Sequence, residues 1–83
     1  MEKFTDVFRA LSDKTRLSIV TLLLEGEKCV CHIFPYVRRT QSTVSIQLGK
    51  LEKWGILESR RQGKWMFYKI RDKRIYSILK ILT

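Results

Sequence analysis

The chain's two cysteines and its only histidine lie within four positions, as Cys29, Cys31 and His32. Thiolate is a soft ligand and imidazole a borderline one, so this group could bind a soft metal or metalloid ion. The two thiols could instead be oxidised. They could also pack in the core, where free cysteine behaves as a small hydrophobe. Residue types alone therefore leave a metal site, a redox pair and structural packing open.

The surroundings of the thiols bear on the redox interpretation. Lys28 and a nearby helix N-terminus are expected to lower a thiol pKa and to favour oxidation. A direct bond between Cys29 and Cys31 would be strained by their proximity, which favours a sulfenic acid or a bridge between subunits. A tetrahedral zinc site would need one ligand more than the two cysteines and His32 supply.

Length and charge limit the class of protein. Eighty-three residues make one domain, 1–83, because so short a chain cannot support two hydrophobic cores. The formal charge of +9 favours a polyanionic partner, nucleic acid ahead of an anionic membrane. With no secretory signal and no spanning segment, we expect a cytoplasmic protein without a membrane partner. An enzyme is poorly supported, because no acidic residue near His32 could orient it.

Helical periodicity and capping residues predict the elements of the first half. One helix spans residues 4–11 with an apolar stripe, and a second, very apolar helix begins after the N-cap Asp13 and ends at Gly26. A third, brief helix from residue 31 or 32 to about 37 places Pro35 in its first turn, where a missing N–H costs little. Residues 28–30 are then extended.

The second half contains a fourth helix, a hairpin and a last helix. The fourth helix begins after Thr40 and ends at Gly55. Two β-like runs, 56–61 and 64–70, are joined by Gln62 and Gly63, and the last helix spans 72–82 with Asp72 as its cap.

The fourth helix has two unlike faces. Val44, Leu48 and Leu51 form a narrow apolar stripe, while the opposite face is small and polar with one isoleucine, which suits a DNA groove. A basic hairpin after such a helix is typical of a wing. The predicted fold is mainly α with a β-hairpin wing, a winged helix-turn-helix in the order α-α-α-α-β-β-α.

Two segments, "ALSDKTRLSIVTLLLEGEKCVCHIF" and "TQSTVSIQLGKLEKWGILESRRQGKWMFYKI", resemble the ArsR/SmtB family of metal-responsive repressors. They share its Cys-Val-Cys, the Ser-Thr-Val-Ser of its recognition helix and its Gly-Lys-Trp-x-x-Tyr wing. The resemblance implies a homodimeric repressor that binds double-stranded operator DNA and is released by an effector. It also implies a dimer interface made by helices 4–11 and 72–82, which their amphipathic patterns independently favour.

The resemblance implies an inducer bound at Cys29 and Cys31, with His32 as a further candidate ligand, and no required cofactor. Soft sulfur ligands suit As(III), Sb(III), Cd(II), Pb(II), Zn(II) or Cu(I). The arsenic sensors of the family carry a third cysteine where this chain has Phe34, and the family's other metal site, on the last helix, is missing. A redox-responsive or effector-independent DNA-binding regulator is the alternative.

Candidate DNA contacts lie on the fourth helix and the wing. Gln can pair with adenine, Ser can contact base or phosphate, and an exposed Ile can lie against a thymine methyl. Thr side chains suit capping and phosphate contact, and the basic wing residues suit phosphates. The candidates are Thr40, Gln41, Ser42, Thr43, Ser45, Ile46, Gln47, Arg60, Arg61 and Lys64. The aromatic residues of the wing and Trp54 could stack on single-stranded bases, but burial against the core is their commoner role.

Overall fold

The computed structural model describes the backbone of residues 2–82 and the side chains of residues 5–82. The side chain of Phe4, which belongs to the predicted stripe of the first helix, lies outside that range, as do Met1 and Thr83. The elements are α1 Glu2–Leu11, α2 Lys14–Leu23, β1 Lys28–Cys29, α3 Val30–Val37, α4 Gln41–Lys53, β2 Leu57–Gln62, β3 Trp65–Ile70 and α5 Arg74–Leu82.

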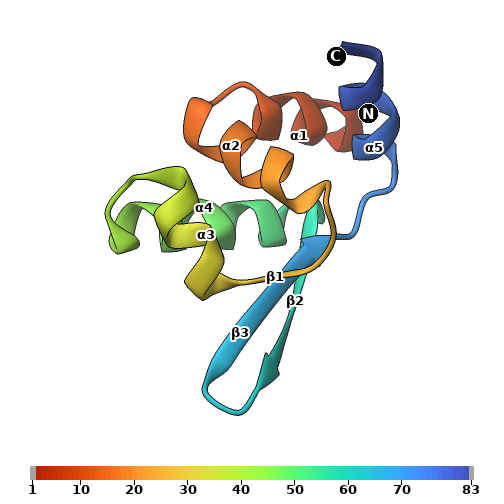
Figure 1. Ribbon diagram of the computed structural model, residues 1–83. Helices are drawn as coiled ribbons and strands as arrows, with labels where there is room; N and C mark the ends of the chain where they lie inside the picture. The colour runs from red at the N-terminus through yellow and green to blue at the C-terminus, as the bar shows by residue number, and fades with distance from the viewer. Residues whose placement is uncertain (1, 83) are drawn as a thin grey trace.

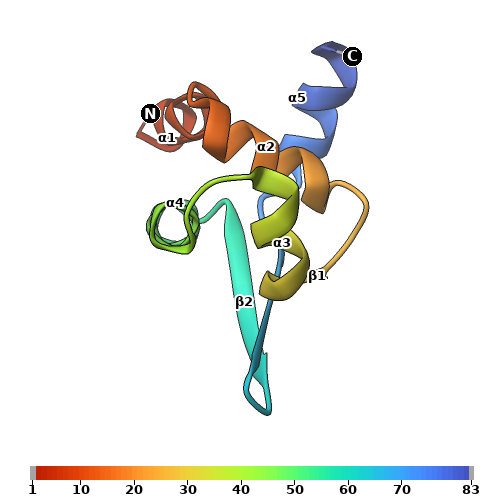
Figure 2. The same cartoon turned by 60° about the vertical axis from the view of Figure 1, so that its left-hand side comes forward.

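This order confirms the predicted winged helix-turn-helix and adds one short strand, β1. In Figures 1 and 2 the β2–β3 hairpin projects from the helical body on the side away from α5. The core is formed by buried aliphatic side chains from every helix and from both hairpin strands. Among residues 2–82, no helix has the length and apolar character needed to cross a bilayer.

Two N-caps form as predicted. The Asp13 carboxylate accepts a hydrogen bond from the Arg16 backbone N–H at 3.0 Å, and the Thr40 hydroxyl accepts one from the Thr43 N–H at 3.1 Å. Each side chain thus pairs one of the N–H groups that a helix start leaves open. At the other end of α4, Gly55 has φ +77°, as expected for the residue after a helix C-cap.

The predicted boundaries of α2 and α3 were wrong. α2 ends at Leu23, before the turn that contains Gly26. α3 begins at Val30, so Pro35 is its sixth residue and lies outside the first turn. The reason is that Cys29 caps α3, its sulfur accepting from the Cys31 N–H at 3.3 Å, so the helix starts earlier than predicted. Pro35 removes the hydrogen bond that the Cys31 carbonyl would otherwise accept.

The sheet has the strand order β1-β3-β2, with both pairs antiparallel. Gln62 pairs with Trp65, so the hairpin turns at Gly63 and Lys64, one residue later than predicted, with Gly63 at φ +64°. β1 is only two residues long, too short to show a periodicity. It pairs with β3 through Cys29 opposite Phe67, which joins the cysteine segment to the wing.

The last helix starts later than the predicted residue 72. α5 begins at Arg74, and the Asp72 carboxylate accepts from the Arg74 backbone N–H at 3.1 Å. The Arg74 guanidinium also donates to Asp72, with Nη2 at 2.6 Å from Oδ2. Asp72 therefore stabilises the helix start as predicted, two residues upstream of it.

Candidate DNA-binding surface and thiol site

The apolar stripe of α4 faces the core. Val44, Leu48 and Leu51 are all buried, while Ser42, Ser45 and Ile46 are exposed on the other side, Ile46 to 58%. Because the stripe is narrow, most of the helix surface remains available to a partner. The predicted groove face is thus accessible, with its small polar side chains next to one exposed isoleucine.

The start of α4 has its own hydrogen-bond network. The Thr40 hydroxyl donates to the Thr43 hydroxyl at 2.9 Å while it accepts from the Thr43 N–H. Gln41, the first helical residue, is exposed beside them. Backbone and side-chain donors at a helix start of this kind can contact a phosphate.

Gln47, a predicted adenine contact, lies beside the core stripe and is half-buried. Its side-chain oxygen accepts a hydrogen bond from Arg16 Nη1 of α2 at 2.8 Å. Bidentate pairing with adenine needs that same oxygen as an acceptor. The structure therefore brings Gln47 to α2 and separates it from the exposed face of Ser42, Ser45 and Ile46.

Arg60, a predicted phosphate contact, is bound within the protein. Its Nε and Nη2 donate to the two carboxylate oxygens of Glu27 at 2.9 and 2.8 Å, and Nη1 donates to Gln62 at 2.8 Å. Its guanidinium also lies 4.6 Å from the centroid of the Phe67 ring. The hydrogen bond from Arg60 holds the pKa of the Glu27 carboxyl below its usual range.

The other basic wing residues, Arg61 and Lys64, are exposed at the hairpin end. Lys64 Nζ lies 5.9 Å from the centroid of the Trp65 ring. Trp65 is 48% exposed, so the prediction that it packs in the core was wrong. It is the first residue of β3 and pairs with Gln62 next to the hairpin turn, at the other end of the strand from the buried Ile70. Trp54 and Tyr68 do pack against the core, and Phe67 is half-buried.

The thiols lie together at the start of α3. Cys29 is buried and Cys31 is exposed, and Cys31 Sγ donates to Cys29 Sγ at 2.7 Å. His32 Nδ1 lies 4.0 Å from Cys31 Sγ. The extended backbone of Cys29, followed by the first helical turn of α3, brings the two sulfur atoms into contact.

The pKa of the Cys31 thiol is raised, first because the thiol is hydrogen-bonded to Cys29 and then because of partial burial. This contradicts the expected lowering by Lys28 and a helix N-terminus. The Lys28 ammonium instead pairs with Glu25, with Nζ 3.2 Å from Oε1. Cys31 is therefore less readily ionised than an ordinary cysteine.

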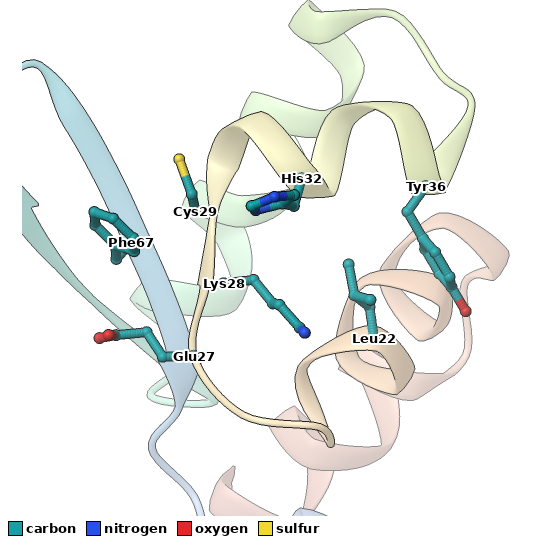
Figure 3. Close-up of a pocket in the computed structure, with 7 residues that line it drawn as sticks. All are labelled: Leu22, Glu27, Lys28, Cys29, His32, Tyr36 and Phe67. Atoms are coloured by element: carbon teal, nitrogen blue, oxygen red, sulfur yellow. The ribbon is translucent and has the colours of Figure 1, made fainter.

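An open hollow of about 420 Å³ lies beside the thiols, lined by Leu22, Glu27, Lys28, Cys29, His32, Tyr36 and Phe67. Figure 3 shows these side chains coming from α2, α3, β1, β3 and the residue just before β1. Within residues 2–82, no three His, Cys, Asp or Glu side chains are grouped so that they could hold a metal ion. Two sulfurs are fewer ligands than the four of a structural zinc site, so the described residues do not form such a site.

A short helix pair whose second helix has an exposed polar face, followed by a basic hairpin, defines a winged helix-turn-helix DNA-binding regulator. Residues 13–59 match the family model described as bacterial regulatory protein, arsR family. This chain belongs to the ArsR family, as the motifs predicted. The family consists of transcriptional regulators, so the prediction that the chain is not an enzyme is confirmed.

Among curated relatives, an uncharacterized HTH-type transcriptional regulator of Methanocaldococcus jannaschii, MJ1325, is 43% identical over 98% of this chain and 92% of its own length. The arsenical resistance operon repressor of Escherichia coli K12 is 43% identical over 77% of this chain and 56% of its own length. A cadmium resistance regulator, the CadC homolog of Staphylococcus aureus, is 37% identical over 89% of this chain and 62% of its own length. The chain thus spans less than two thirds of these arsenic and cadmium regulators.

Solved structures agree with the fold. The transcriptional repressor BigR from Xylella fastidiosa matches with a TM-score of 0.91 and 32% identity, over 98% of this chain and 83% of that one. A homodimeric winged helix-turn-helix DNA-binding domain of Mycobacterium bovis, Mb0332, matches with a TM-score of 0.85 and 28% identity. The match covers 98% of this chain and 78% of that one. The wing, the recognition helix and both terminal helices are therefore part of a shared architecture.

Proposed function

We propose that this protein is a dimeric repressor that binds operator DNA through α4 and the wing and is released by a soft metal or metalloid ion bound at Cys29 and Cys31. The main support for release by a bound ion is the contact between the two sulfurs, which lie 2.7 Å apart. They belong to the segment that starts α3 and pairs with β3. The names of the Escherichia coli and Staphylococcus aureus relatives, which refer to arsenic and cadmium resistance, support it.

For the DNA half, the candidate contacts divide into three groups. Ser42, Ser45 and Ile46 face the groove, while Thr40, Gln41 and Thr43 at the helix start and Arg61 and Lys64 on the wing contact phosphates. A dimer that neutralises about 6–10 phosphates would lose about 10³–10⁵ in affinity between 50 and 200 mM salt. Apolar side chains exposed on the terminal helices support the dimer.

For the effector half, a bound soft ion would hold the two thiolates and displace their protons. Cys29 Sγ accepts the Cys31 N–H at the start of α3, so a cation on that sulfur would compete with this cap. Cys29 of β1 also lies opposite Phe67 of β3 in the sheet. A displacement of Cys29 by a bound ion would therefore shift a strand of the wing. Because His32 is not grouped with both sulfurs in the described part of the chain, a third ligand would come from the partner subunit or require His32 to move.

The test begins with a duplex selected by the wild-type protein from randomised double-stranded DNA. As(III) or Cd(II) is titrated while thiolate charge-transfer absorbance and duplex binding are followed together. We expect both to change at the same metal concentration, and the Cys29→Ser/Cys31→Ser variant to keep binding DNA without either response. An unaltered response in that variant would contradict the effector proposal, and failure to select any duplex would contradict the DNA half.

A redox response is the second candidate, favoured by the same sulfur contact. Hydrogen peroxide would take two electrons from the two thiols, forming one S–S bond and two water molecules. The raised pKa of Cys31 opposes the redox and the metal response alike, because the thiolate is both the form that peroxide oxidises and the metal ligand. Release from DNA by peroxide in the absence of metal, reversed by a dithiol reductant, would favour this candidate over the metal response.

A further inference from the structure

Arg16 of α2 joins three parts of the molecule through one half-buried guanidinium. Nε donates to the Ala10 carbonyl at 3.3 Å and Nη2 donates to the Arg9 carbonyl at 3.0 Å, both at the end of α1. Nη1 donates to Gln47 of α4 at 2.8 Å. The guanidinium also lies 5.2 Å from the centroid of the Trp54 ring, at the C-cap of α4. Arg16 thus contacts α4 both in its middle and at its end.

Apolar packing alone does not fix the rotation of the recognition helix, α4, about its own axis. Its buried stripe consists of Val44, Leu48 and Leu51, which is narrow, and apolar packing is not directional. A helix has a radius of about 5–6 Å with side chains, so a rotation of about 10° moves a side-chain tip by roughly 1 Å. Base contacts tolerate displacements of only about 0.5 Å. A planar guanidinium bound at two points of α4 fixes this rotation.

We propose that Arg16 is a positioning residue for sequence recognition: through Gln47 and Trp54 it sets the rotation of α4 and so the presentation of Ser42, Ser45 and Ile46 to the groove. In this role Gln47 acts toward α2 and does not read a base. The inference rests on the proposed DNA contacts of α4, and it adds a determinant that lies outside the groove.

The competing interpretation is that Arg16 contacts a phosphate. All three of its nitrogen atoms already donate within the protein, to two carbonyls and one carboxamide. A phosphate contact would require only the charge, which lysine also carries, whereas the positioning role requires donors in three fixed directions. The charge-conserving change Arg16→Lys therefore separates the two roles.

The experiment measures affinity for the selected duplex and for a scrambled duplex of equal length, over a salt series. The variants are Arg16→Lys, Arg16→Gln, Gln47→Ala and the double variant Arg16→Lys/Gln47→Ala. We expect each single change to lower the ratio of selected to scrambled affinity about tenfold, because a hydrogen bond to a charged group is lost. We expect the double variant Arg16→Lys/Gln47→Ala to be no worse than Arg16→Lys alone, since that change already removes the contact that Gln47→Ala removes. Lys14→Gln, an exposed change in the same helix, is the control.

Three results would overturn the inference. The first is an unchanged ratio in Arg16→Lys, with a loss and a reduced salt slope only in Arg16→Gln, which indicates a phosphate contact. The second is an equal loss on both duplexes in parallel with thermal destabilisation, which indicates folding alone. The third is additive losses in the double variant. If the wild-type protein selects no duplex, the proposed function fails and this inference fails with it.

Discussion

At the scale of single residues, the partners of a charged side chain decide what it can do. Arg60 and Arg61 are neighbours on β2 and carry the same charge, but they differ in their surroundings. Both side chains are exposed, but Arg60 holds Glu27 with two hydrogen bonds and lies over Phe67, whereas Arg61 makes no such contact with the described residues. Of the two, only Arg61 can meet a phosphate without first giving up an internal contact.

We therefore expect different effects from Arg61→Gln and Arg60→Gln. Arg61→Gln should reduce the slope of log affinity against log salt by about 0.9 per DNA-contacting subunit, because one phosphate contact is lost. Arg60→Gln should leave the slope close to that of the wild type and weaken binding through the loosened wing. Fluorescence anisotropy over a salt series measures both. Equal slope changes in the two variants would show that the Glu27 pair opens on DNA.

At the scale of elements, side chains at helix starts hold the elements in place. Asp13, Thr40 and Asp72 each accept a backbone N–H at the start of a helix, and Cys29 does so with its sulfur. The cap on α3 differs from the others because its atom is also a candidate metal ligand. The start of α3, where the proposed effector site lies, therefore depends on a candidate metal ligand, the sulfur of Cys29.

The cap of α5 predicts a pH-dependent stability. Asp72→Ala should lower the free energy of unfolding by about 1 kcal/mol at pH 7, the usual cost of a lost cap. The hydrogen bonds from Arg74 lower the pKa of Asp72 in the folded protein, so its contribution is present above the ordinary aspartate range. It is lost as the pH falls through the lowered folded pKa.

Urea unfolding at several pH values tests this expectation. The difference between wild type and Asp72→Ala should shrink in acid and vanish below the folded pKa of Asp72. Glu58→Gln serves as the control, because its pair with Lys69 is exposed and long, at 3.7 Å, and its removal should cost little. A difference that stays constant down to the lowest pH would refute the assignment of the effect to the Asp72 carboxylate.

At the scale of the whole molecule, the distribution of exposed apolar side chains indicates assembly. Phe8 of α1 is 64% exposed, and Ile81 and Leu82 of α5 are 83% and 74% exposed. In Figure 1, α1 and α5 lie at the opposite end of the molecule from the hairpin. A dimer formed there would leave both wings free for two half-sites on the same duplex.

Ile81→Lys should therefore dissociate the dimer. Two symmetry-related isoleucines would each lose about 1.5–3 kcal/mol of burial, which corresponds to a rise of roughly 10²–10⁴ in the dimer dissociation constant. Sedimentation velocity at micromolar concentration should show a monomer. Ile46→Lys, the same change on the exposed face of α4, should leave the dimer intact. A dimer that survives Ile81→Lys would exclude Ile81 from the interface.

The amino-acid sequence by itself determined the features that are encoded within a few neighbouring residues. Capping side chains, apolar spacing and the glycine of the hairpin were sufficient to predict all five helices, although not all of their boundaries, and the wing. The motifs were sufficient to predict the ArsR family. The exact start of α3 was missed because the sequence does not show that the Cys29 sulfur caps this helix.

Only the tertiary structure decided which candidate side chains are already bound. Gln47 is held by Arg16, 31 positions away, and Arg60 by Glu27, 33 positions away. Such pairs depend on how α2 packs on α4 and how the segment before β1 meets the wing, which spacing along the chain cannot reveal. The same holds for the raised pKa of Cys31, because it depends on the direction in which the neighbouring sulfur points.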